Sequence, residues 1–369
     1  MKKLLRFVKQ NTVLCVAFVA ALVTSFFVPP DAEWAGYFDW KTLACLFMTL
    51  GVVCALRDIK FFSIVARRLV RLTGNLRILT LALVYVTFLG SMLIANDMAL
   101  ITFLPLGYFA LDVTKQQKHM AYVFILQNIS ANLGGMLTPF GNPQNLYLYT
   151  AFSIPTGEFM GIMLPPFLLA VAMLTVCCLL LKPTPLRITE VFPENLNVRR
   201  TALYFALFAL SILIVFRLVP YYVGLVLVPA VLLIADRDAL AQVDYPLLGT
   251  FFLFFIFSGN LSRIPEVRVF LSGLLDWDAL LVPVLSCQLI SNVPTAILLS
   301  RFTENYRALL LGVNIGGTGT LIASLASLIS FSEFRLLCPG EGKRYFRLFT
   351  LVNLIFLVVM TAAAKLWFV

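Results

Sequence analysis

The stretch Asn132-Leu133-Gly134-Gly135-Met136-Leu137-Thr138 recurs 182 positions later as Asn314-Ile315-Gly316-Gly317-Thr318-Gly319-Thr320, and this repetition decides the fold. Each copy lies a short way after an apolar segment that contains an asparagine, Asn96 before the first copy and Asn292 before the second. The chain is therefore predicted to consist of two related halves. Apolar helices interrupted by Asn, Gly and Thr are typical of membrane carriers, because the interruption offers backbone and amide groups to a solute.

The composition indicates a membrane protein. Of the 369 residues, 61% are hydrophobic and only 12% are charged, whereas charged residues make up about 25% of soluble domains. At roughly 20 residues per spanning helix, the chain has room for about ten hydrophobic segments. We therefore expect an all-α polytopic protein whose main partner is the lipid bilayer.

The net charge of +10 is better explained by orientation in a membrane than by a nucleic-acid partner, because Lys and Arg cluster between the apolar segments. The basic N-terminus, with Lys2, Lys3, Arg6 and Lys9, is predicted to lie in the cytoplasm. Following the charges along the chain predicts about nine crossings plus two re-entrant hairpins. The C-terminus is then external, and the expected location is the plasma (inner) membrane.

The first half is predicted to cover residues 1–182. Residues 78–113 form an apolar run of 36 residues, which as one helix would be about 54 Å long against a hydrocarbon core of about 30 Å. The run must therefore fold back, and Ala95-Asn96-Asp97 is the expected turn. The charges at its ends fit a hairpin or two full crossings equally well. A broken helix is predicted over residues 120–150, interrupted from Thr138 to Asn145.

Residues 183–221 are predicted to form a cytoplasmic linker and a connecting helix, so that the second half, residues 222–369, is inverted relative to the first. Its hairpin is expected over 279–300, interrupted at Ser291-Asn292-Val293-Pro294-Thr295, and its broken helix over 308–330. A hairpin is favoured over a full crossing at 279–300 because it keeps Arg335, Lys343 and Arg347 in the cytoplasm.

Asp97 lies deep within an apolar stretch. An intramembrane carboxylate indicates a functional role, because burying an unpaired charge is costly. Asp97 is therefore expected to bind a coupling cation or a proton. The alternative is that Asn96 or Asp97 caps a helix beginning at Met98, and both roles are compatible.

Polar residues recur in the same order at the breaks of both halves, which favours two pseudo-symmetric sites over glycine motifs for helix packing. Amide, hydroxyl and carbonyl oxygens suit a small cation, while helix N-termini attract an anion. The residues expected to bind substrate are Asn96, Gly141, Asn142, Asn145, Ser291, Asn292, Thr295 and Ser324. Those expected to bind the coupling ion are Asp97, Asn132, Thr138, Asn314 and Thr320.

The chain contains no Gly-rich phosphate loop with Lys, no His-Glu-x-x-His and no Gly-x-Ser-x-Gly. These absences argue against a pump with its own ATPase and against a membrane protease. No enzymatic activity, cofactor or nucleic-acid partner is therefore expected, and Na⁺ or H⁺ is the only ion expected beside the substrate.

Three motifs resemble those of the ion transporter superfamily, which contains divalent-anion:sodium symporters, citrate carriers, arsenite permeases and some sodium/proton antiporters. Thr138 to Asn145 resembles its Thr-Pro-x-Gly-Thr-x-x-Asn element, and Ser291 to Thr295 resembles its Ser-Asn-Thr hairpin tip. Ala95 to Leu100 is more similar to the citrate carrier and arsenite permease-like branch.

This resemblance implies inverted repeats with one hairpin each, a substrate site between the hairpin tips and the helix breaks, elevator-type movement and a homodimer. The chain departs from the family pattern at the first tip, at Gly141-Asn142 and at Ala323-Ser324-Leu325-Ala326-Ser327. We therefore expect a secondary active transporter for a small anion, such as citrate or a dicarboxylate, coupled to Na⁺ or H⁺. The alternatives are an arsenite or Na⁺/H⁺ antiporter and, with less support, a passive channel.

Overall fold

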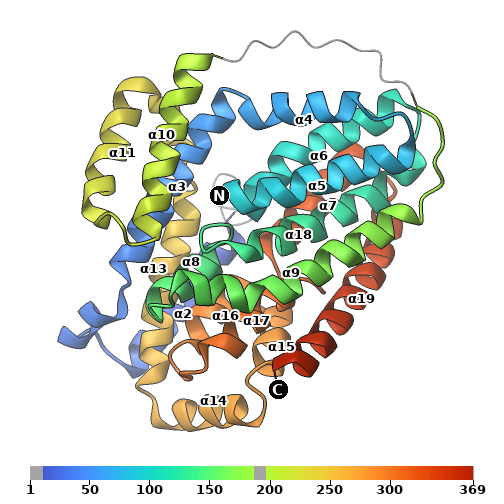
Figure 1. Cartoon of the computed structure of the whole chain (residues 1–369). Helices are drawn as coiled ribbons and strands as arrows, with labels where there is room; N and C mark the ends of the chain where they lie inside the picture. The colour runs from blue at the N-terminus through green and yellow to red at the C-terminus, as the bar shows by residue number, and fades with distance from the viewer. Residues whose placement is uncertain (1–10, 187–196, 369) are drawn as a thin grey trace.

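The computed structural model describes residues 11–186 and 197–368. Within these residues the chain forms 18 α-helices and no β-strand (Figure 1). Six helical segments are long and apolar enough to cross a membrane, which confirms the expectation of an all-helical, multi-pass membrane protein. They span Trp40–Asp58, Leu76–Ile94, Thr156–Leu179, Val198–Val215, Arg237–Ser262 and Gly342–Leu366.

The chain is described from α2 (Thr12–Phe27), which is followed by the 3-10 helix η1 (Ala32–Tyr37) and by α3 (Trp40–Asp58). Asp39 fixes the start of α3, because its carboxylate accepts a hydrogen bond from the backbone N–H of Thr42 at 2.9 Å. α4 (Phe61–Arg71) forms where the basic segment predicts a short amphipathic helix.

The apolar run at residues 78–113 folds into two helices that pack against each other, α5 (Leu76–Ile94) and α6 (Asn96–Val113). A single residue, Ala95, joins them, and its φ of 64° lies in the left-handed region. The chain therefore reverses at the residue where the sequence predicts the turn. α6 includes both Asn96 and Asp97, whereas the cap interpretation started this helix at Met98.

The expected broken helix forms as α7 (Met120–Gly134), the 3-10 turn η3 (Gly135–Leu137) and α8 (Pro143–Ala151). The interruption is shorter than the one predicted from Thr138 to Asn145, because Pro143 begins α8. Proline is suited to the first turn of a helix, where its missing N–H has no helical acceptor. The break therefore comprises residues 138–142.

Four helices lead from the first break towards the second half: α9 (Thr156–Leu179), α10 (Val198–Val215), α11 (Tyr221–Ala235) and α13 (Tyr245–Ser262). α12 (Arg237–Ala241) is a short turn before α13. The linker predicted before α10 lies partly outside the described residues.

A second interrupted region follows α14 (Pro265–Trp277). α15 (Leu281–Ile290) and α16 (Asn292–Leu299) are joined by a single residue, Ser291, with φ 74°. α17 (Tyr306–Gly316) and α18 (Leu325–Leu337) are separated by a break of eight residues, 317–324. α19 (Gly342–Phe368) is the last helix.

The helices form two groups. α3 packs against α10 and α11, and α2 packs against α13. α7 packs against α5, α6, α9, α18 and α19, which lie together on the other side of the molecule in Figure 1. The two groups meet where α13 contacts α16 and where α3 contacts α8.

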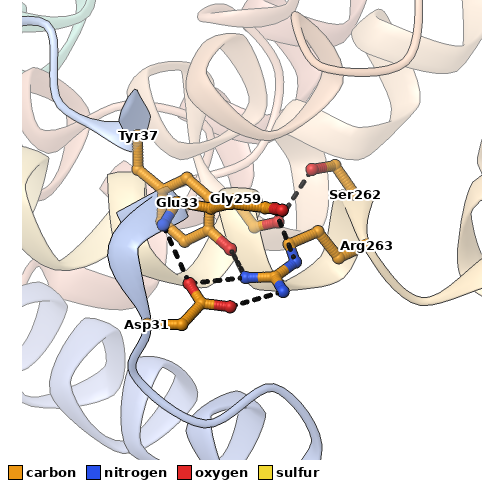
Figure 2. Close-up of polar contacts among 6 residues, drawn as sticks. All are labelled: Asp31, Glu33, Tyr37, Gly259, Ser262 and Arg263. Atoms are coloured by element: carbon orange, nitrogen blue, oxygen red, sulfur yellow. Dashed lines mark hydrogen bonds and ion pairs between the residues drawn. The ribbon is translucent and has the colours of Figure 1, made fainter. Parts of the chain in front are cut away.

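An ion-pair cluster ties η1 to the end of α13 (Figure 2). Arg263 pairs with Asp31 at 2.6 Å and with Glu33 at 3.2 Å, and its guanidinium donates to the Tyr37 hydroxyl at 3.1 Å. The hydrogen bond from Arg263 holds the pKa of Asp31 below its usual value of 3.8. Tyr37 also packs over Gly259, where a Cβ would lie 2.4 Å from the ring.

Candidate functional site

The first turns of four helices line one cavity of about 470 Å³. Asn96 and Asp97 belong to α6, Gln144 to α8, Asn292 to α16 and Leu325 to α18. All four helices begin at this cavity, so their N-terminal ends, with the free N–H groups of each first turn, lie around one space. Residues of α2 and α13 complete the lining.

The two single-residue turns at the cavity have the same local geometry. Ala95 has φ 64° and ψ 154°, and Ser291 has φ 74° and ψ 160°. In both cases the next residue is an asparagine whose side-chain oxygen accepts a hydrogen bond from the following backbone N–H, at 3.0 Å for Asn96 and 2.9 Å for Asn292. The predicted correspondence of Asn96 and Asn292 is therefore matched by their conformations.

Asn96 is connected to the break of the first half. Its amide donates to the Asn132 side-chain oxygen at 3.0 Å, and the Asn132 backbone carbonyl accepts from the Asn142 amide at 3.3 Å. The amide of Asn145 donates to the backbone carbonyls of Gly135 and Met136, both at 3.2 Å. These side chains replace the helical hydrogen bonds that the break removes.

Each broken helix also binds the broken helix of the other half. The Asn314 amide of α17 donates to the Asn145 side-chain oxygen of α8 at 2.6 Å. The Asn128 amide of α7 donates to the Ser327 hydroxyl of α18 at 3.3 Å. Asn145 and Ser327 are 182 residues apart, which is the interval between the two sequence copies. The candidate residues of both halves thus share one buried hydrogen-bond network.

Two threonines at equivalent positions, also 182 residues apart, bind neighbouring helices instead of lining the cavity. The Thr138 hydroxyl donates to the backbone carbonyl of Met92 on α5 at 3.0 Å. The Thr320 hydroxyl donates to the carbonyl of Gln288 on α15 at 3.2 Å. Both threonines therefore hold a break against the first arm of a helix pair.

The remaining candidate residues are buried behind the cavity wall. The Thr295 hydroxyl donates to the Ser291 carbonyl at 2.7 Å, and the Ser324 and Ser327 hydroxyls are 2.9 Å apart. Gly141 allows a close backbone contact, since a Cβ there would lie 2.3 Å from the Gly135 carbonyl oxygen. Of the candidate residues, the cavity is lined by Asn96, Asp97, Ser291 and Asn292.

Several buried acceptor oxygens at this site have no hydrogen-bond donor. They belong to Asp97, Asn128, Asn142 and Gln144, and Asp97 and Gln144 line the cavity itself. A buried acceptor without a donor is costly unless a ligand supplies the missing positive partner. The oxygens are thus chemically suited to a small cation. No side-chain hydrogen bond caps α6, so the Asp97 carboxylate is not the cap of that helix.

Sequence reasoning missed two further carboxylates in the cavity wall, Asp244 before α13 and Glu333 on α18. Asp244 accepts a hydrogen bond from the backbone N–H of Leu247 at 2.9 Å, and the Asp-x-Pro start of a helix was its signal in the sequence. Glu333 gave no signal, because it lies near the end of an apolar helix. No Lys or Arg is among the described residues that line the cavity.

Comparison with known proteins identifies the family. The family model described as citrate transporter matches residues 7–305. An uncharacterized transporter of Methanocaldococcus jannaschii is 31% identical over 90% of this chain and 91% of its own length. The inner membrane protein YbiR of Escherichia coli is 29% identical over 83% of each chain. A silicon efflux transporter of Oryza sativa is 30% identical over 43% of this chain and 33% of its own length. The chain therefore belongs to the citrate transporter family of membrane transporters.

Proposed function

We propose that this membrane transporter is a secondary active carrier of a small anion, such as citrate or a dicarboxylate, and that Na⁺ or H⁺ drives it. The observation that carries the proposal is the convergence of four helix N-termini on a cavity whose described lining contains no Lys or Arg. The partial positive charge at each N-terminus favours an anion by about 0.3–1 kcal/mol at an exposed site and more in a partly buried one.

The coupling ion would bind beside the anion. Asp97 and the amide oxygens of Asn142 and Gln144 are buried without donors, and the C-terminal end of α7 lies next to them. Half-helix C-termini and exposed carbonyls are the usual Na⁺ ligands of such carriers. A cation at this position would satisfy these oxygens and offset the negative charge of the bound anion. This arrangement supports symport.

We further propose that residues 1–182 and 222–369 form two inverted repeats, with re-entrant hairpins at α5–α6 and α15–α16. The proposal is supported by the helix ends, because α7 ends at Gly134 and α17 at Gly316, again 182 residues apart. The helices after the breaks, α8 and α18, begin at residues 143 and 325 with the same interval. Two copies of one fold explain why one offset fits both.

The two groups of helices suggest how the carrier moves. The group around α7 would slide as an elevator against the group of α2, α3, α10, α11 and α13, with the cavity at their junction. The plasma (inner) membrane remains the proposed location, and a homodimer the proposed assembly. Contacts between the groups at α13–α16 and α3–α8 are the ones that such a movement would change.

Antiport of arsenite, or of Na⁺ against H⁺, is the second candidate. It is favoured by one observation, the three carboxylates of Asp97, Asp244 and Glu333 around the cavity. Like charges around a small space favour a bound cation or proton. In an antiporter Asp97 would carry the proton, and no carboxylate substrate would bind.

The test is uptake of labelled citrate and succinate by proteoliposomes, with an inward Na⁺ gradient, an inward proton gradient or no gradient. Accumulation that requires one of the gradients supports the symport proposal and names the coupling ion. Gradient-independent equilibration would indicate a passive pathway. No citrate or succinate uptake, together with Na⁺-driven proton efflux or arsenite transport in the same vesicles, would establish the antiporter instead.

A further inference from the structure

A basic groove lies between the end of α18 and the start of α19, away from the residues of the candidate site. Its volume is about 910 Å³, and its lining includes Phe331, Arg335, Lys343, Phe346 and Arg347. The residues on each helix are spaced three or four apart, so each helix presents them on one face. The Pro339-Gly340 turn closes the end of the groove, where Gly340 has φ 93°.

Aromatic rings form the floor of the basic groove. The Phe331 and Phe346 rings contact each other edge to face, with centroids 6.5 Å apart. The Arg335 guanidinium lies 5.6 Å from the centre of the Phe331 ring, which orients this cation at the groove. The groove is thus built from both helices rather than from loose surface side chains.

The charge of the basic groove is uncompensated. Arg335, Lys343 and Arg347 contribute three positive charges, and no acidic residue is among the described residues that line it. The nearest acid in the sequence, Glu341, pairs with Arg344 at 3.0 Å and is not part of the lining. A phosphate group would offset this repulsion and accept hydrogen bonds from the arginines.

An exposed apolar stripe begins one turn after Arg347 on α19. Leu351, Leu354, Ile355 and Val358 follow at helical spacing and are 58%, 50%, 49% and 58% exposed. In a helix that crosses a membrane, such residues contact acyl chains. A ligand that fills the groove and also follows this stripe needs a phosphate headgroup and hydrocarbon tails.

From this juxtaposition we infer that the basic groove binds the headgroup of an anionic phospholipid, with its acyl chains along the α19 stripe. Basic pockets between transmembrane helices are suited to such headgroups. The bound lipid would hold the ends of α18 and α19 together. Because α18 begins at the cavity, the lipid would also support the position of this helix, whatever the transported substrate is.

Native mass spectrometry of the purified protein, titrated with phosphatidylglycerol, tests the inference. We expect saturable one-to-one adducts in the wild type and binding at least about tenfold weaker in the double variant R335Q/R347Q. The matched control is R199Q/R200Q, which removes two exposed arginines from the first turn of α10 and should bind like the wild type. Thermal unfolding in detergent checks that each variant folds, and the single variant K343Q replaces R335Q/R347Q if the latter does not.

Phosphatidylcholine and inorganic phosphate distinguish the sources of the phosphate. The inference expects both to compete for phosphatidylglycerol at least about tenfold more weakly than the unlabelled lipid itself. Competition by inorganic phosphate at the strength of the lipid would overturn it in favour of a free-phosphate site. It is also overturned if the groove variant binds like the wild type, or if the α10 control loses as much binding as the groove variant.

Discussion

Single residues define where charge enters this protein. Asp97 lies at the first turn of α6, beside Asn96 and facing the cavity that Gln144 and Asn292 also line. Its Oδ1 atom is buried and has no hydrogen-bond partner. A carboxylate in such a place is stable only when a cation, a proton or a shared ligand accompanies it. Asp97 is therefore the residue on which coupling should depend most.

Replacing Asp97 with Asn should lower gradient-driven uptake by about tenfold or more, because the amide keeps the shape of the side chain but removes its charge. Folding should survive, since Oδ1 makes no hydrogen bond that the amide would lose. Uptake in proteoliposomes and the midpoint of thermal unfolding measure the two effects. The control is D112N, at the exposed end of the same helix; wild-type uptake by D97N would remove Asp97 from the coupling mechanism.

At this scale the sequence identified the amides but not all of the acids. Asn96 and Asn292 could be predicted because each interrupts an apolar run, and the structure places both at the cavity. Asp244 and Glu333 could not, since only tertiary packing brings α13 and α18 to the same space. Thr138 and Thr320 were chosen for their place in the repeated motif, yet their hydroxyls bind helix carbonyls.

Elements place these residues by stopping and starting at set points. α5 and α6 reverse at Ala95, α15 and α16 reverse at Ser291, and both broken helices resume at the cavity. The repeated Asn-x-Gly-Gly motif predicted both breaks, because glycine and asparagine weaken a helix at that point. It did not predict where α8 resumes, since the local preference of Pro143 for the first helical turn was read as part of the interruption.

The break between α7 and α8 should not tolerate a side chain at Gly141. A Cβ there would lie 2.3 Å from the Gly135 carbonyl oxygen, a backbone atom that cannot rotate away. Gly141→Ala should therefore destabilise the protein by about 1–3 kcal/mol, read as a lower midpoint of thermal unfolding, and should reduce uptake. Gly161→Ala on α9, which has open space, is the control; equal midpoints for the two variants would contradict this description of the break.

The ion pair between η1 and α13 should give stability a specific pH dependence. Because the pKa of Asp31 lies below 3.8 in the folded protein, the pair stabilises the protein above that value and is lost as the pH falls through the folded pKa. The difference in unfolding midpoint between wild type and Asp31→Asn should be constant between about pH 5 and pH 7 and shrink below about pH 4. A difference that grows on acidification would show the opposite sign of linkage.

The whole molecule consists of two helix groups that meet at one cavity, and the two halves of the chain contribute to that cavity in matching ways. The composition predicted a multi-pass helical protein, and the repeat interval predicted which helices would be interrupted. The packing of α2 against α13 and of α4 over α6 could not be read from the sequence, because apolar helices in a membrane carry little information on their neighbours.

Orientation in the membrane is a prediction at this scale. An odd number of crossings places the N-terminus in the cytoplasm and the C-terminus outside. Alkaline phosphatase fused after Val369 should therefore be active in intact cells, whereas a green fluorescent protein fused at the same position should be dark. A control fusion after Lys182, before the linker, should give the reverse result. Identical readouts from the two positions would contradict nine crossings and two hairpins.

The most direct test of the central claim, that one cavity holds an anion and its coupling ion together, is the dissociation constant of citrate for the purified protein with and without Na⁺ and at two pH values. Linkage requires that a coupling ion tighten citrate binding by the same factor by which citrate tightens ion binding, typically about 5–150-fold. We predict such tightening by Na⁺ or by protons in the wild type and its loss in D97N. Citrate binding that is independent of both ions, or absent under all conditions, would contradict the account.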